Sequence, residues 1–204
     1  MDYLIESVYL YLTMLRLTFI TSLCLWLTMA SGVNLDSLWG VWNDSTQPDT
    51  NRLMAIQKCC HGYLFSQPDS ASYFAGLQYK FAEALGNKEY MSAAHSTQGI
   101  SFAVRGNYEV ALSYFKKYLK IAEETGNKKG VASSLGNIGN IFQAKGNYEE
   151  AMEYYFKSFK LMQETGDKKG MASSLNNIGE VYNGQGNYEQ ALAYYQKSLK
   201  IDKE

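Results

Sequence analysis

The residues that could support acid–base or metal chemistry are few in this sequence. It contains two histidines, His61 and His95, and His61 directly follows Cys59 and Cys60. Neighbouring residues of a helix point about 100° apart, so these three side chains cannot converge on one metal ion. A general base needs a partner that positions it, and neither histidine lies near an acidic pattern. We therefore expect no catalytic residue, no metal and no cofactor here, and cysteines buried as small apolar residues.

Nucleotide or nucleic-acid binding is not indicated by the sequence either. A phosphate loop needs a glycine-rich turn followed by Lys and Ser or Thr, and this pattern does not occur. The chain carries 19 Lys and Arg against 20 Asp and Glu, and a balanced charge gives no reason to expect a nucleic-acid partner. Four lysines cluster at two expected turns, where we expect solvent contact rather than a clamp for a terminal carboxylate: Lys128, Lys129, Lys168 and Lys169.

The chain repeats one stretch of sequence at a fixed interval. The run Gly-Asn-Tyr-Glu starts at Gly106, Gly146 and Gly186, a period of forty residues. Repeats of about 20–50 residues indicate a solenoid, whose units cannot bury their apolar faces alone. Apolar residues inside each unit recur with helical spacing, which predicts an all-α solenoid of antiparallel helix pairs. His95 stands where the next unit has Leu135, so we expect it to have a packing or rim role.

Two short turns separate the expected helices. Gly146 is expected to take the left-handed conformation that ends one helix. Asn147 is then expected to cap the next helix, with Glu150 completing a capping-box-like pair. At the other turn, Glu-Thr-Gly-Asn/Asp-Lys-Lys-Gly, we expect Asn127 and Asp167 to act as caps.

A weaker copy of the pattern extends toward the N-terminus. Gly99 falls forty residues before Gly139, and Pro68 falls at the first position of an expected helix, where its missing N–H costs nothing. The array is therefore expected to cover residues 50–204. Its four expected units are 50–85, 86–125, 126–165 and 166–204.

The spacing of small and aromatic residues resembles the tetratricopeptide repeat, whose units read W-x2-L-G-x2-Y and then A-x3-F. This chain departs from that pattern in its period of forty residues and in lacking the closing proline, as in the longer variants of kinesin light chains. The resemblance implies a right-handed superhelical solenoid in which the first helix of each unit lines a concave face. The matching residues in one unit are Leu135, Ile138, Gly139, Phe142, Ala151 and Tyr155, and in the next Leu175, Ile178, Gly179, Tyr182, Ala191 and Tyr195.

The polar residues expected on that concave face are mostly amides. An amide offers a donor and an acceptor, so it can pair with the backbone of an extended peptide. The resemblance adds that such adaptors hold a peptide main chain with asparagines in this place. A solvated polar face or interhelical hydrogen bonds are the alternatives. The candidate peptide-binding residues are Asn137, Asn140, Gln143, Asn176, Asn177, Glu180 and Asn183.

The first 32 residues differ from the repeats. The run from Leu17 to Leu35 carries no charge and follows Arg16, which is typical of a signal peptide or an uncleaved membrane anchor. Translation could then begin at Met14, because residues 1–13 are acidic. We expect an exported, periplasmic or membrane-anchored protein, or a cytoplasmic one if this run is a packed helix.

The segments that flank the array complete the expected organisation. Residues 33–49 are expected to be a polar linker. The region from this linker onward resembles the N-terminal sensor part of Bacteroidetes-type nucleotide cyclases and histidine kinases that contain tetratricopeptide repeats. The sequence thus predicts a non-catalytic scaffold that binds a protein or peptide, or alternatively a sensory or dimerisation fragment of such a signalling enzyme. A partner or a second copy is expected to cover the apolar side of the last helix: Ala191, Tyr194, Tyr195 and Leu199.

Overall fold

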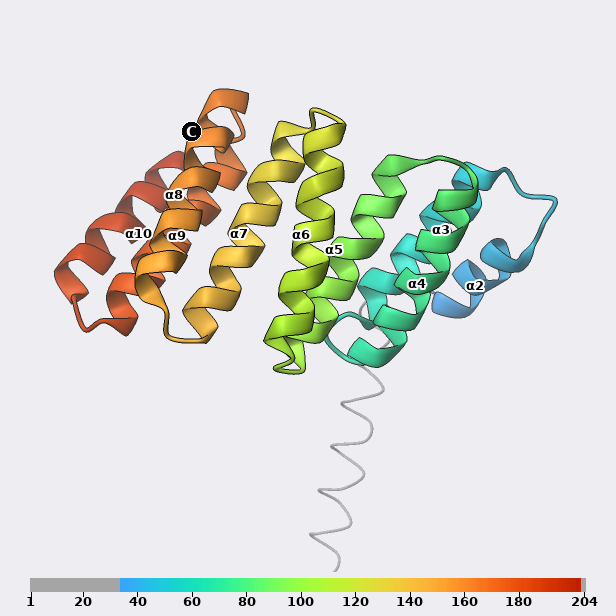
Figure 1. Cartoon of the computed structure of the whole chain (residues 1–204), viewed down its shortest axis with the longest axis horizontal. Coiled ribbons are helices and arrows are strands. Elements are labelled where there is room, and N and C mark those ends of the chain that lie inside the picture. Colours follow the sequence, from blue (N-terminus) through green and yellow to red (C-terminus); the bar gives the residue numbers. More distant parts are fainter. Residues whose placement is uncertain (1–33, 203–204) are drawn as a thin grey trace, which may run out of the picture. The chain divides into compact units, whose positions relative to one another are not determined.

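The computed structural model describes residues 34–202, and the expected signal or anchor segment, residues 1–32, lies outside them. None of the described helices is long and apolar enough to cross a membrane. Residues 34–202 are all-helical, as predicted, and successive helices lie side by side (Figure 1). Their nine helices are α2 (Leu35–Asn43), α3 (Asp49–Tyr63), α4 (Pro68–Ala84), α5 (Lys88–Val104), α6 (Tyr108–Glu124), α7 (Lys128–Ala144), α8 (Tyr148–Thr165), α9 (Lys168–Gly184) and α10 (Tyr188–Asp202).

The helices form two layers. Each helix packs against the next one in the sequence, and further contacts join α3 to α5, α5 to α7 and α7 to α9. Among the described residues no such contact joins α4 to α6, α6 to α8 or α8 to α10. Helices α3, α5, α7 and α9 therefore lie on the side of the array where alternate helices come closer together. We call α3, α5, α7 and α9 the inner helices, and α4, α6, α8 and α10 the outer helices.

The hydrophobic core repeats with the same forty-residue period. One cluster joins α6 to α7 through Ala111, Phe115, Ile138 and Ile141. The equivalent cluster joins α8 to α9, and each of its residues lies forty positions later: Ala151, Tyr155, Ile178 and Val181. Each core thus connects an outer helix to the inner helix of the next unit, which is why one unit cannot bury its apolar face alone.

Glycine on an inner helix lets an aromatic ring of its own unit come close to the backbone. A Cβ added at Gly139 would lie 2.7 Å from Cε1 of Tyr155. A Cβ at Gly179 would lie 2.7 Å from Cε1 of Tyr195. The small residues of the sequence pattern therefore have a packing role at these two positions.

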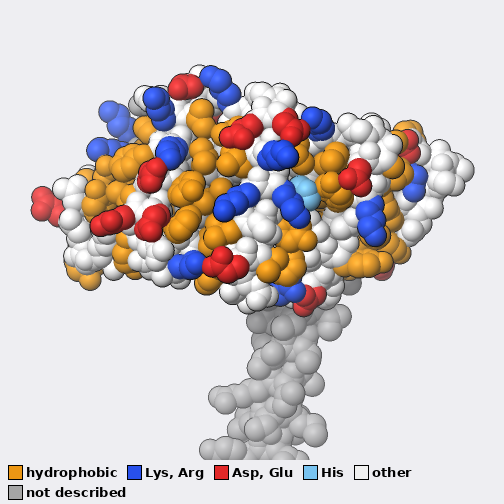
Figure 2. Space-filling model, viewed as in Figure 1, with side chains coloured by type: hydrophobic (Ala, Val, Ile, Leu, Met, Phe, Trp, Pro, Cys, Tyr) orange, Lys and Arg blue, Asp and Glu red, His pale blue; other side chains and the backbone are white. Residues whose placement is uncertain are grey.

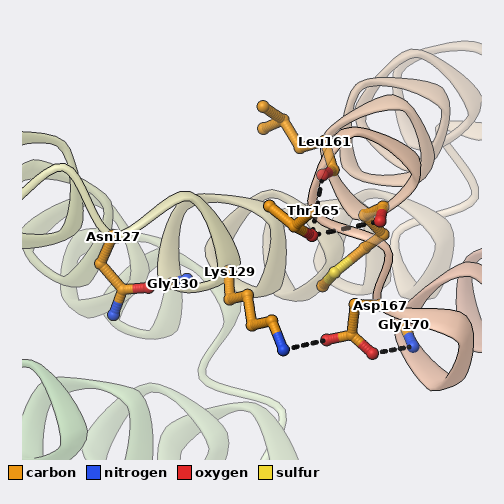
Figure 3. Close-up of polar contacts among 8 residues, drawn as sticks. Asn127, Lys129, Gly130, Leu161, Thr165, Asp167 and Gly170 are labelled. Atoms are coloured by element: carbon orange, nitrogen blue, oxygen red, sulfur yellow. Dashed lines mark hydrogen bonds and ion pairs between the residues drawn. The ribbon is translucent and has the colours of Figure 1, made fainter.

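The tight turns follow the expectation in part. Gly146 and Gly166 have φ values of 79° and 67°, in the left-handed region that ends a helix. The side chains of Asn127 and Asp167 accept hydrogen bonds from the backbone N–H groups three residues later, at 2.9 and 3.0 Å, as predicted (Figure 3). Pro68 begins α4, also as predicted.

Asn147 occupies the N-cap position of α8, but the side-chain cap expected of it is not formed. Its side chain accepts no such bond from the described residues, so Glu150 completes no capping box. The backbone differs as well, since ψ is 84° at Asn127 and 87° at Asp167 but 72° at Asn147. Asn107, with ψ of 65°, also makes no side-chain cap. The two asparagines without a side-chain cap are thus those with the smaller ψ.

Residues 33–49 contain helix α2 where a polar linker was expected. Trp42 is buried, and its ring centroid lies 5.2 Å from that of Phe81 in an edge-on contact. Arg52 donates from Nε to the carbonyl oxygen of Trp42 at 3.0 Å. Trp39 packs on Phe74 at 5.3 Å between ring centroids. Two tryptophans three residues apart lie on one face of a helix. Through these contacts α2 packs against α3 and α4.

The last outer helix exposes much of its apolar side. Leu192 and Leu199 are 58% and 54% exposed, and the equivalent residues of α8 are less exposed. Ala191 was expected on this open side but is buried. An alanine side chain is short enough to be covered by α9, the other helix of its pair. The four unit boundaries drawn from the sequence remain a prediction.

The close approach at Gly139 predicts opposite effects for two substitutions in α7. Gly139→Ala should lower the free energy of unfolding by about 1–3 kcal/mol, because the buried Tyr155 ring must shift. Gly136→Ala is the control, since its Cβ would meet only Ser158 Oγ, at 3.7 Å. It should raise the free energy of unfolding by about 0.5–1 kcal/mol through helix propensity. Urea unfolding followed by circular dichroism measures both, and equal effects would contradict the packing argument.

The cap geometry predicts a difference between two asparagines at equivalent kinds of position. Asn127→Ala should lower the free energy of unfolding by about 1 kcal/mol, because the N–H of Gly130 loses its acceptor. Asn147→Ala should change it by less than about 0.5 kcal/mol, because no side-chain cap is lost. The measurement is again urea unfolding, and the cap assignment fails if both variants lose the same stability.

Candidate functional site

The seven candidate peptide-binding residues lie on the two inner helices α7 and α9. Asn137, Asn140 and Gln143 follow one another at three-residue intervals on α7, while buried Ile138 and Ile141 face the core. A helix has 3.6 residues per turn, so this spacing keeps the amides near one face. The equivalent positions on α9, forty residues later, carry Asn177, Glu180 and Asn183.

The structure brings these residues together in two groups rather than in one row. A hollow of about 420 Å³ lies between α7 and α9 and is lined by Asn140, Gln143, Glu180 and Asn183. A second hollow, of about 460 Å³, contains Asn176 and Asn177 together with Lys169 of α9 and Ser198 of α10. Asn137 belongs to neither hollow.

Tyr155 of the outer helix α8 is buried behind the first hollow and contacts two of the amides that line it. Its hydroxyl oxygen lies 2.7 Å from Asn140 Oδ1 and 2.6 Å from Gln143 Oε1. A hydroxyl carries one proton, so it donates to one of these two oxygens at a time. Asn140 Oδ1 also accepts from Nδ2 of Asn177 at 3.3 Å, which links α7 to α9. Interhelical hydrogen bonds, one of the alternatives considered for these residues, therefore exist at four of the seven positions, since Glu180 also bonds with Tyr195 of α10.

Burial and negative charge keep the tyrosine hydroxyls protonated. Burial is the main cause that raises the pKa of Tyr155 above its usual range, and the charge of Glu180 raises it further. Burial also raises the pKa of Tyr195, and Glu180 contributes through its charge and a hydrogen bond. Both hydroxyls consequently act as hydrogen-bond donors near neutral pH. Sequence reasoning assigned Tyr155 to the repeat motif but did not predict its contact with the amides, although its position sixteen residues after Gly139 is visible in the sequence.

Two of the four lysines at the turns form ion pairs with residues of the following turn. Lys128 Nζ lies 3.1 Å from a carboxylate oxygen of Glu164, and Lys129 Nζ lies 3.7 Å from Asp167 (Figure 3). Both lysines are exposed, as expected for a solvated turn. The sequence carried a signal for the first pair, because Lys88 and Glu124 form the same contact one unit earlier at 2.9 Å. Exposed pairs of this kind add little stability.

The histidines and cysteines do not converge on a reactive site. Cys59 and Cys60 are buried free thiols, whereas His61 is exposed. Burial is the main cause that raises the pKa of Cys60 to about 12, so its thiol stays protonated. His95 is buried on α5, in the packing position expected for it. No three His, Cys, Asp or Glu side chains among the described residues form a group that could hold a metal.

Solved structures with a similar fold come from several kinds of protein. BtubC from P. vanneervenii has a TM-score of 0.64 and 19% identity, covering 82% of this chain and 69% of that chain. A Rap protein complexed with Competence and Sporulation Factor has a TM-score of 0.70 and 15% identity, covering 76% of this chain and 44% of that chain. A signal transduction ATPase of the STAND class with a tetratricopeptide repeat sensor, from Pyrococcus horikoshii, has a TM-score of 0.64 and 18% identity, covering 78% and 25%.

These likenesses describe the fold alone, and this chain spans less than half the length of the last two proteins. No curated protein is significantly similar in sequence. The profile of the tetratricopeptide repeat matches residues 90–164 and again 130–204, which together make up more than half of the chain. The forty-residue period, the paired helices and the glycine–aromatic contacts fall inside these matches. The chain therefore belongs to the tetratricopeptide repeat family.

Proposed function

We propose that this chain is a non-catalytic scaffold that binds a protein or peptide across the inner faces of α7 and α9. The observation that carries the proposal is the hollow between these two helices. It presents amide and carboxylate groups from equivalent positions of successive units: Asn140, Gln143, Glu180 and Asn183. Polar groups repeated in this way can pair with a backbone that repeats its own N–H and C=O groups.

The spacing of the helices suits an extended ligand. Packed helices lie about 8–10 Å apart, and an extended chain rises about 3.3 Å per residue. One step from α7 to α9 therefore corresponds to about three residues of an extended peptide. The hollow contains one carboxylate, that of Glu180, which favours a peptide with a basic side chain or exposed N–H donors at this step.

The known proteins with this fold support a binding role. The Rap protein described above was solved in complex with Competence and Sporulation Factor. At 15% identity that likeness extends to the fold, so the class of partner in our protein is part of the proposal.

A second candidate function is the sensory part of a larger signalling protein, such as a cyclase or kinase. The STAND ATPase favours this alternative, because its repeat array is described as a sensor and this chain spans 25% of that protein. Export or membrane tethering through residues 1–32 is also part of the proposal. Recovery of the full chain in the soluble cytoplasmic fraction would overturn the export and tethering idea. Pairing of two copies through the exposed side of α10 is a further part, and sedimentation equilibrium measures it.

The peptide-binding proposal predicts a specific loss of affinity. Peptides selected from a displayed random library against the full chain should bind the double variant Gln143→Ala/Asn183→Ala about tenfold more weakly, because the backbone of the peptide loses two amides that line the hollow. Fluorescence anisotropy with labelled peptides measures the affinity, and circular dichroism reports whether the array remains helical.

Asn147→Ala is the matched control, because it removes an asparagine from a turn outside the two hollows. It should leave the affinity unchanged. Equal affinity of the double variant and the wild-type protein, at normal helicity, would contradict binding through the inner amides. A selection that yields no peptide would favour the sensory alternative.

A further inference from the structure

A second concave site lies on the opposite layer of the array, between the outer helices α4 and α6. Its volume is about 550 Å³, and the inner helix α5 forms its floor. Tyr79 and Tyr114 belong to its walls, and His95 and Gln98 come from α5. Figure 2 shows lysine or arginine side chains beside hydrophobic ones over α5 and α6. We call this site the α4–α6 groove.

The α4–α6 groove differs from the equivalent groove between α8 and α10 at three positions that line it. Gly76, His95 and Gln98 are all lining residues. The equivalent groove between α8 and α10, of about 490 Å³, has Phe156 and Leu175 at the first two of these positions. The third position holds Ile178, which is buried in a hydrophobic cluster. All three departures make the α4–α6 groove more open or more polar than its counterpart.

Gly76 is not required by the backbone or by close packing. It lies inside α4, and it is not among the glycines with positive φ. A Cβ at Gly76 would meet only Nε2 of Gln98, at 3.9 Å. Glycine inside a helix is less favourable than alanine, and here no close neighbour explains it. The missing side chain leaves open space beside the Gln98 amide.

His95 gives the groove a neutral aromatic floor. Its ring centroid lies 4.6 Å from that of Tyr79 and 5.8 Å from that of Tyr114. Nδ1 of His95 lies 3.2 Å from Gln98 Oε1, and donation to this oxygen leaves the Gln98 Nε2 protons for a ligand. Burial is the main cause that lowers the pKa of His95; the hydrogen bond with Gln98 and the charge of Glu83 oppose this shift, and the charge of Lys117 adds to it. The imidazole is therefore uncharged near neutral pH.

The rim of the groove is positively charged. Lys80, Lys117 and Lys120 line it and are exposed. None of the three forms an ion pair within the described part of the chain, whereas Glu124, the one carboxylate in the lining, is held by Lys88 at 2.9 Å. The ammonium group of Lys117 lies 4.8 Å from the centroid of the Tyr114 ring. Three lysines around a concave aromatic surface favour a negatively charged ligand.

We propose that the α4–α6 groove binds a small organic anion with a planar apolar body. The planar body lies against the rings of Tyr79, His95 and Tyr114, and the anionic group lies toward the lysines and the Gln98 amide. The volume is in the range of sites for small molecules, which combine apolar walls with a few polar groups. This site is separate from the inner hollow, so its occupation does not depend on peptide binding there.

The two histidines of the chain make the test direct. His95 lies in the groove and His61 lies on α3, so the ring signals of His61 in an NMR spectrum of the full chain serve as an internal reference. β-Naphthoate is the probe, and β-naphthylmethylammonium is the same ring with the opposite charge. We expect β-naphthoate to shift the His95 signals saturably, to leave those of His61 in place, and to bind about tenfold more tightly than the ammonium compound. The proposal is overturned if the His95 signals do not move, or if both probes bind equally.

Two substitutions at Gly76 separate blocking from stabilisation. Gly76→Phe places in the groove the side chain that occupies the equivalent position of α8, and it should abolish the saturable shift. Gly76→Ala adds one methyl group with room to spare, and it should retain the shift. Unchanged binding by Gly76→Phe would overturn the proposal.

Substitution of the lysines at the rim tests the proposal if Gly76→Phe fails to fold. The double variant Lys117→Gln/Lys120→Gln should weaken β-naphthoate about tenfold. Lys197→Gln/Lys200→Gln makes the same change in the counterpart groove between α8 and α10, and it should have no effect on the His95 signals. Equal loss of binding in the two double variants would show a general charge effect and overturn the proposal.

Discussion

The contact on which the array depends is the approach of one aromatic ring to a glycine of the inner helix. The Tyr155 ring lies so close to Gly139 that a Cβ there would be 2.7 Å away. The same ring then joins Ile178 and Val181 in the core that connects α8 to α9. One side chain thus holds its own helix pair together and also binds the next pair. Since each unit touches only its neighbours, the array is stable only if this contact recurs along it.

The same side chain connects the fold to the candidate binding face. The hydroxyl of Tyr155 lies beside the amides of Asn140 and Gln143, so the core residue also orients polar groups of the inner hollow. One unit earlier the equivalent pair is Phe115 and Ile100, which have no polar group to share. The polar inner surface described above lies on α7 and α9, whose paired outer helices α8 and α10 carry Tyr155 and Tyr195 in place of the phenylalanine. The packing of the core and the arrangement of these amides are thus coupled through a single hydroxyl group.

The sequence predicted what depends on its period and on local chemistry. The forty-residue repeat predicted the helix pairs, and the glycines predicted the turns, because few other residues tolerate a φ near 79°. Predictions failed where neighbouring elements decide the outcome. Asn127 and Asn147 are the same residue type at the start of a helix, yet only Asn127 makes a side-chain cap, which the residue types do not reveal. The hydrogen bonds of Asn140 depend on the depth that the Tyr155 ring reaches between two helices.

Helix α2 and the α4–α6 groove both differ from the repeat, but with opposite effects on the surface. In α2 the unusual residues are large, and Trp42 with Arg52 covers apolar surface at the first unit of the array. In the α4–α6 groove three residues are smaller or more polar than those of the counterpart groove between α8 and α10, and they leave open space beside Gln98. A side chain that packs against nothing contributes no free energy of burial. A departure from the repeat is therefore expected where it covers apolar surface or leaves room for a ligand. Gly76 covers no apolar surface, and the absence of its side chain leaves space beside the Gln98 amide.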